Sequence, residues 1–171
     1  RNLWEFPFQA LVNRSGQFLI EKYSISYAPS LTVLASLSRN ISKQTTSAST
    51  NSLLAFGNPQ FLKEDALYQS NENPLVKLPF AESLVNRIKN LYQPQKTKVF
   101  VGSNATKTQF ESEANKYETI HLATHGLLDD FRPLQSRFWL ATDQNTTKKT
   151  GWVEAREIMK MKLQAQLVIL S

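Results

Sequence analysis

From residue 52 onward, short apolar stretches alternate with amphipathic ones, and this order constrains the fold more than any other feature of the sequence. Buried strands are predicted for SLLAFGNP, KTKVFVGS, YETIHLA, SRFWLATD and AQLVILS. Between them, Pro79 precedes a segment with helical periodicity, Thr106 and Gln109 form a capping box, and VEAREIMKM predicts a helix over 153–161. Together these features predict an α/β fold with a mainly parallel sheet and helices on both faces.

The amino-terminal part predicts a different local structure. Apolar and polar residues alternate on both sides of Arg14-Ser15-Gly16, so we expect an antiparallel hairpin at one edge of the sheet. Pro29 opens a segment with helical spacing. Eight of the fifteen residues from 38 to 52 are Ser or Thr, which predicts a flexible insertion within a single domain spanning 1–171.

Composition excludes several classes of function. The chain has no cysteine, which excludes a disulfide framework and a thiolate zinc site. Its formal charge of +6 comes from scattered basic residues, so nucleic-acid binding is not expected. No apolar run reaches the length of a membrane span, and no glycine-rich phosphate motif suggests a cofactor. The sequence starts at Arg1 without a leader, so we expect part of a longer, cytoplasmic polypeptide.

One predicted strand ends at a candidate for chemistry. In YETIHLATHG, His125 follows the strand by two residues and precedes Gly126. Sites in parallel sheets form beyond the carboxyl ends of the strands, where an imidazole can act as a general base. A loop histidine bonded to the backbone explains the pattern equally well. Gly126 would let backbone N–H groups approach a ligand.

Other polar residues near this strand are weaker candidates. His121 lies within the strand and is expected to be a core residue, and four residues of strand span roughly 13 Å, which argues against a two-histidine metal site. Ser171 ends a strand without a Gly-x-Ser-x-Gly elbow, so it is not predicted to be a nucleophile. A charged loop could line a substrate groove, although solvated loop charges are the simpler interpretation; its members are Asp129, Asp130 and Arg132.

Several segments in series resemble the CHAT domain, a caspase-like domain found next to tetratricopeptide repeats. The strongest are IHLATHG, PLQSRFWLA and GWVEAREIMKMKLQAQLVILS, and LLAFGNP and VGSNATKTQF resemble earlier blocks in the same order. The resemblance implies a three-layer α/β/α sandwich and a Cys–His dyad, with His125 as the histidine and Gly126 as a backbone position on the oxyanion side. In the family, the strand matching LVILS runs into Ala-Cys. The domain is therefore expected to be incomplete, with its cysteine two positions after Ser171.

Two functions are implied by the resemblance. The first is a cysteine endopeptidase domain that cleaves a protein or peptide substrate under the control of an amino-terminal tetratricopeptide or similar repeat domain. The second is a pseudo-peptidase that keeps the fold and binds a partner protein. Because a base without a nucleophile cannot form an acyl-enzyme, the 171 residues by themselves are expected to be inactive.

Overall fold

The computed structural model falls into two compact units, Arg1–Ala48 and Ser49–Ser171, which are described separately. The residues that the structure describes are 6–28, 30–44, 52–61, 75–143 and 150–171. Across these residues, none of the helices is long and apolar enough to cross a membrane.

The first unit contains the turn that was predicted near its start. Gly16 adopts a φ of 79°, and the side chain of Asn13 accepts hydrogen bonds from the N–H groups of Ser15 and Gln17 at 2.8 and 3.1 Å. Antiparallel pairing is limited to an isolated bridge between Val12 and Phe18, outside the two sheets of the second unit. The flanking segments are short helices, η2 (Phe8–Ala10) and α1 (Leu19–Lys22). The expected hairpin is thus reduced to its turn and one bridge.

Helix α2 (Leu31–Gln44) completes the described part of this unit. The Ser30 hydroxyl accepts a hydrogen bond from the Val33 N–H at 3.1 Å, which satisfies a donor of the first turn. The helix continues through residues 38–44, the first part of the segment predicted to be a flexible insertion. Residues 45–51 lie outside the described residues, and the flexibility of 38–52 stays a prediction.

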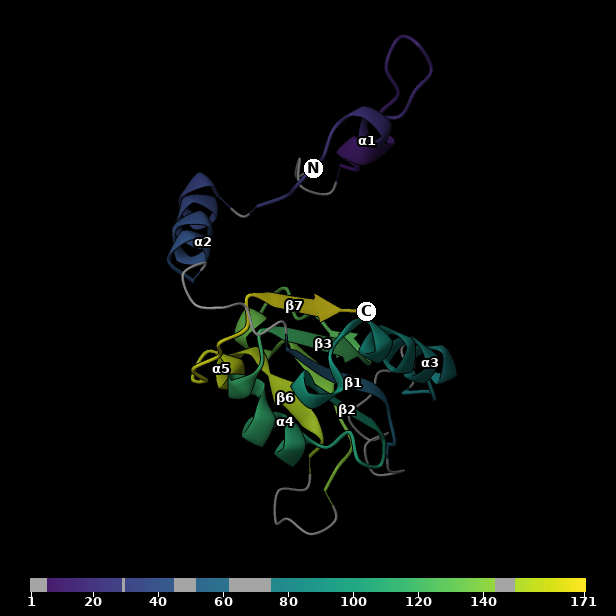
Figure 1. Ribbon diagram of the computed structural model, residues 1–171, viewed down its shortest axis with the longest axis vertical. Helices are drawn as coiled ribbons and strands as arrows, with labels where there is room; N and C mark the ends of the chain where they lie inside the picture. Colours follow the sequence, from purple (N-terminus) through teal and green to yellow (C-terminus); the bar gives the residue numbers. More distant parts are fainter. Residues whose placement is uncertain (1–5, 29, 45–51, 62–74, 144–149) are drawn as a thin grey trace. The chain divides into compact units, whose positions relative to one another are not determined.

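The second unit is built on a four-stranded parallel sheet with the strand order β2-β1-β3-β7 (Figure 1). Its strands are β1 (Leu53–Pro59), β2 (Thr97–Gly102), β3 (Thr119–Ala123) and β7 (Leu167–Leu170). β1 is central and almost wholly buried, as expected for a strand covered on both faces. β3 and β7 are parallel neighbours, in agreement with the predicted mainly parallel sheet.

Helices cover both faces of this sheet, so the predicted α/β class is also confirmed. On one face, α3 (Pro79–Ile88) packs Val85 against Leu53 and Ala55. A Cβ added at Gly57 would lie 2.6 Å from a methyl carbon of Val85, so this close approach requires glycine. On the other face, α4 (Lys107–Glu113) contributes Phe110 to a second core. The short 3₁₀ turns are η4 (Lys89–Leu91), η5 (Pro94–Lys96), η6 (Ala114–Lys116) and η7 (Pro133–Gln135).

A second sheet, antiparallel and three-stranded, has the order β4-β5-β6. It consists of β4 (Gly126–Leu127), β5 (Arg137–Trp139) and β6 (Trp152–Glu154). SRFWLATD therefore forms a strand as predicted, but in this sheet rather than the parallel one. Phe138 and Val153 pack into the core that contains Phe110. The expected helix over 153–161 begins later and is shorter, because Val153 and Glu154 belong to β6 and α5 spans Ala155–Ile158.

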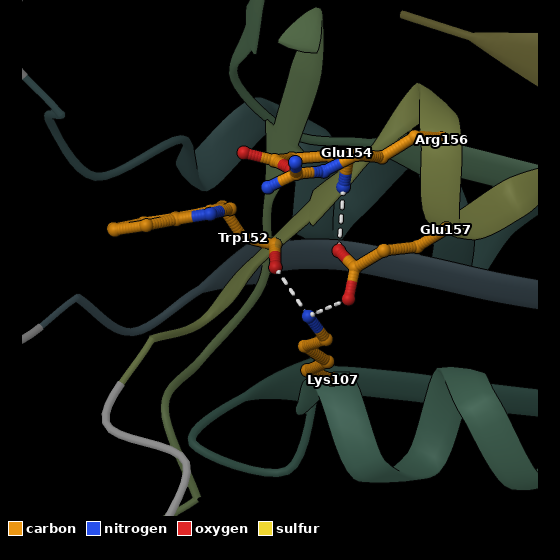
Figure 2. A network of polar contacts seen from close by, with 5 residues as sticks. All are labelled: Lys107, Trp152, Glu154, Arg156 and Glu157. Atoms are coloured by element: carbon orange, nitrogen blue, oxygen red, sulfur yellow. Dashed lines mark hydrogen bonds and ion pairs between the residues drawn. The ribbon is translucent and has the colours of Figure 1, made fainter. Parts of the chain in front are cut away.

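The buried ammonium group of Lys107 connects α4 to this small sheet. Figure 2 shows the Lys107 ammonium reaching the Trp152 carbonyl at 3.0 Å and the Glu157 carboxylate at 2.7 Å. Glu157 in turn accepts a hydrogen bond from the Glu154 N–H at 2.9 Å, and this bond is half of the capping box that starts α5. Because the Lys107 side chain is buried, loss of its partner would leave an uncompensated charge.

Candidate active site

The carboxyl ends of β3 and β7 form the edge at which the site was predicted. Leu122 pairs with Leu170, and the Ser171 N–H donates to the Leu122 carbonyl at 3.1 Å. Neighbouring strands of a sheet lie about 4.8 Å apart. Ser171 therefore lies beside the end of β3, and His125 follows that end by two residues.

His125 is partly exposed, and its backbone is fixed by the small sheet. The Trp139 N–H donates to the His125 carbonyl at 3.0 Å, which brings β5 against the residue just before β4. On the side-chain end, the imidazole Nε2 lies 2.8 Å from the carbonyl oxygen of Val76, and the Phe61 ring lies 5.7 Å from the imidazole ring. The loop-histidine interpretation is correct in one respect, since this side chain does bond to the backbone.

That bond also determines the chemistry open to His125. A carbonyl oxygen can accept but not donate, so Nε2 must carry the proton of the neutral ring. The lone pair is then on Nδ1, and no described residue is hydrogen-bonded to Nδ1. General-base chemistry requires a ring nitrogen whose lone pair is available, and Nδ1 is the candidate in this ring.

Among the described residues, Gly126 lies on the edge strand of the small sheet. Because the Trp139 N–H bonds to the His125 carbonyl, the alternation of an antiparallel ladder makes Gly126 and Phe138 a pair without mutual hydrogen bonds. The Gly126 N–H therefore points away from β5, and β4 is the edge strand. A Cβ at this position would approach the Arg137 carbonyl oxygen no closer than 3.8 Å. Packing inside the described chain therefore does not require glycine here.

A cavity of about 440 Å³ lies beside Gly126, between the small sheet and the end of β7. Apolar side chains dominate its walls: Leu122, Leu127, Phe138, Val153, Ile158 and Leu170. Thr124 and Ser171 also line it, so the cavity opens at the same strand ends as the histidine. Mostly apolar walls with a few polar groups are typical of a ligand pocket.

His121 occupies a contrasting environment within β3. It is 3% exposed, as expected for a core residue, and its Nε2 lies 2.9 Å from the Ser171 hydroxyl. Its Nδ1 is buried without a hydrogen-bond partner in the described part of the chain. Burial lowers the pKa of His121, because a charged ring would lose its hydration. Burial thus disfavours the charged form of this ring.

The charged loop after β4 is organised around Asp129. The Asp129 carboxylate accepts hydrogen bonds from the backbone N–H of Arg132 at 2.8 Å and of Phe131 at 3.2 Å, and it pairs with the Arg132 guanidinium. The hydrogen bond from the Arg132 N–H, helped by the guanidinium charge, holds the pKa of Asp129 below its usual value. The lining of the 440 Å³ cavity includes none of Asp129, Asp130 and Arg132. Asp129 and Arg132 hold the conformation of the loop. That the three residues line a substrate groove stays a prediction.

Comparison with known families decides what kind of domain this is. The family model described as the CHAT domain matches residues 1–171, the whole chain. The chain belongs to the CHAT domain family. No curated protein matches it significantly. Membership makes this a caspase-like, peptidase-type domain and agrees with the parallel sheet between helices.

The candidate site includes one partner that sequence reasoning missed, the Val76 carbonyl. A backbone oxygen carries no side-chain signature, and 49 residues separate it from His125. The sequence offered one signal for this contact, because Val76 lies close to Pro79, where α3 begins. A helix that begins beside a strand end brings the residues before it to the site.

Proposed function

We propose that this CHAT domain supplies the base of a cysteine endopeptidase, with the nucleophile two positions after Ser171. The observation that carries the proposal is the arrangement of His125 at the end of β3. Its Nε2 lies 2.8 Å from the Val76 carbonyl oxygen, and the parallel pairing of β7 with β3 supports a nucleophile near the same strand ends. Family membership supports the same chemistry at the level of a peptidase-type domain.

The proposed reaction assigns one task to each group. Nδ1 of His125 takes the proton of the cysteine thiol, and the thiolate attacks the carbonyl carbon of the scissile peptide bond. The negative charge that develops on the carbonyl oxygen is met by backbone N–H groups, among them the Gly126 N–H at the free edge of β4. The His125 imidazolium then protonates the leaving amine as the C–N bond breaks, and water hydrolyses the thioester to release the acid and restore the thiol.

The test is to express the domain with its natural continuation and to search for protein or peptide cleavage after activation. We expect cleavage that is abolished by a thiol-alkylating reagent, whereas the 171 residues by themselves cleave nothing. A continuation without cysteine at the second position after Ser171, or cleavage that resists alkylation, would contradict the proposal. Expression with and without the amino-terminal part of the parent protein would test whether a repeat domain is the regulator.

A binding module without peptidase activity is the second candidate, and the apolar cavity beside Gly126 is the observation that favours it. A space of about 440 Å³ with apolar walls can hold a partner's side chain without any bond being broken. Val153→Phe would narrow this cavity and should weaken binding of a partner protein, whether the domain is a peptidase or a binding module. Intact partner recovered after long incubation with the extended, activated protein would favour the binding module.

A further inference from the structure

Asn58 ends the central strand in an uncommon backbone conformation. Its φ is 48°, and among the described residues it is the one residue other than glycine with a positive φ. The pairing of β1 with β2 shifts between Gly57 and Pro59, so Asn58 forms a bulge at the end of the strand. Asparagine tolerates this left-handed conformation better than most residues do, but strain of this kind persists where the surroundings hold it.

The side chain of Asn58 joins this bulge to the start of α3. Its Oδ1 accepts a hydrogen bond from the Leu78 N–H at 2.7 Å, and its Nδ2 donates to the Glu82 carboxylate at 2.9 Å. Leu78 is the residue before the helix, and its own side chain cannot cap it. Although Asn58 lies in a strand, it thus accepts a hydrogen bond from a backbone N–H at the start of α3, as the side chain of a helix-capping residue would. Both polar atoms of its amide are used.

The same attachment fixes the residues before Leu78. Val76 lies two residues upstream and is 52% exposed, so burial does little to hold this residue. Its carbonyl oxygen nevertheless lies 2.8 Å from Nε2 of His125. The bond between Asn58 and Leu78 is thus placed where it can determine the direction of the Val76 carbonyl.

We propose that Asn58 is a positioning residue for His125. It holds Leu78, Leu78 orients the Val76 carbonyl, and the carbonyl keeps the proton of the neutral imidazole on Nε2 and the lone pair on Nδ1. The inference rests on the proposed function for its catalytic meaning, since Nδ1 is the atom that would take the thiol proton. The tautomer itself is a property of the 171-residue chain and can be measured without any activity.

The experiment is ¹⁵N NMR of the histidine side chains in the 171-residue chain, at a pH where both rings are neutral. With two histidines in the chain, His121→Phe leaves His125 alone and assigns its signals. We expect the Nε2–H tautomer at His125. Asn58→Gly keeps the positive φ and removes the amide, and it should shift His125 to a mixture of both tautomers. An unchanged tautomer in a folded Asn58→Gly variant would overturn the proposal.

Two further variants separate orientation from general loss of packing. Glu82→Gln leaves the bond from Leu78 to Asn58 intact and should leave the tautomer unchanged. Asn58→Asp places a second carboxylate beside Glu82 and should disturb the tautomer, while Asn58→Asp combined with Glu82→Gln restores a donor beside the new carboxylate and should rescue it. Failure of this rescue would contradict the assigned hydrogen bonds.

Activity of the extended protein gives the second readout. Misplacement of a reacting group by about 1 Å costs on the order of 100-fold. We expect Asn58→Gly and Asn58→Asp each to lower kcat by about 10- to 100-fold with little change in KM, and Asn58→Asp combined with Glu82→Gln to recover the loss caused by Asn58→Asp. An extended protein without peptidase activity would refute the proposed function and leave the tautomer result standing. A tautomer that ignores Asn58 would refute the positioning role even in an active peptidase.

Discussion

One histidine lies in the middle of β3 and a second follows its carboxyl end, four residues later. The two imidazole rings lie in contrasting environments. His121 is 3% exposed and bonds to the hydroxyl of Ser171, while one ring nitrogen stays buried without a partner in the described chain. His125 is partly exposed and bonds to a carbonyl, while no described residue is hydrogen-bonded to its other ring nitrogen. The comparison teaches that residue type alone does not determine the chemistry open to a histidine. Desolvation of the ring and the hydrogen-bond partner of one ring nitrogen determine it.

The largest expected effect is on the chemistry at the strand end. In the extended, activated protein, His125→Ala should lower peptidase activity by roughly 10²- to 10⁴-fold, the contribution of a general acid–base group. Its unfolding free energy should change by about 1 kcal/mol or less, since one hydrogen bond of a partly exposed ring is lost. Rates of peptide cleavage and urea unfolding curves measure the two quantities. Unchanged turnover in a folded His125→Ala variant would remove this histidine from the mechanism.

Next in size is the effect on stability inside the strand. His121→Ala removes a fully buried ring, so the unfolding free energy of the 171-residue chain should decrease by about 2 to 3 kcal/mol. The same denaturant curves serve as the measurement, with His125→Ala as the matched control. If both alanine variants lost equal stability, the contrast between a structural and a chemical histidine would fail.

The contrast between the two histidines should also appear in how stability depends on pH. Burial lowers the pKa of His121 below its ordinary 6.5, so the unfolded chain takes up a proton there that the folded chain does not. Stability should therefore be greatest above pH 6.5 and decrease as the pH falls below it. We expect His121→Phe to flatten this decrease and His125→Ala to retain it, in thermal unfolding between pH 7.5 and 5.5. An unaltered slope in His121→Phe would show that another group is responsible.

The smallest effect is expected at the hydroxyl that His121 contacts. Ser171→Ala deletes the partner of Nε2 and should cost about 0.5 to 1.5 kcal/mol, the net contribution of one hydrogen bond. Ser171→Thr keeps the hydroxyl and should cost less. Hydrogen exchange at the Ser171 amide, which bonds to the Leu122 carbonyl, would report loosening of the end of β7. A Thr variant that is weaker than the Ala variant would contradict this bond.

Sequence reasoning succeeded where a pattern repeats along one element and failed where a contact joins distant ones. Burial of both faces made β1 and β3 recognisable, and the position of His125 followed from the end of β3. The small sheet was not separated from the parallel one, because strands of two or three residues are too short to show a period. The hairpin prediction placed the turn correctly but overestimated its strands, since Gly16 specifies a turn and not the length of the strands beside it.

The parts of the site that could not be predicted are those without a side-chain signature. The Val76 carbonyl is a backbone group, and its approach to His125 depends on the docking of α3. Asn58 left a faint signal as an asparagine between glycine and proline at a strand end, a pattern typical of turns. No pattern indicated that its amide would reach across to the start of α3.

The register between β3 and β7 makes the site tolerant of insertions in some places and intolerant in others. Residues added to the connections between these strands lengthen the chain without altering which residue of β7 faces which residue of β3. One residue added inside β7 would turn every later side chain to the opposite face. Under the proposed function, a nucleophile after Ser171 would then point away from His125, although the sequence distance between them had changed by a single position. We therefore expect related chains to vary in length between the two strands and to keep the spacing within each strand end.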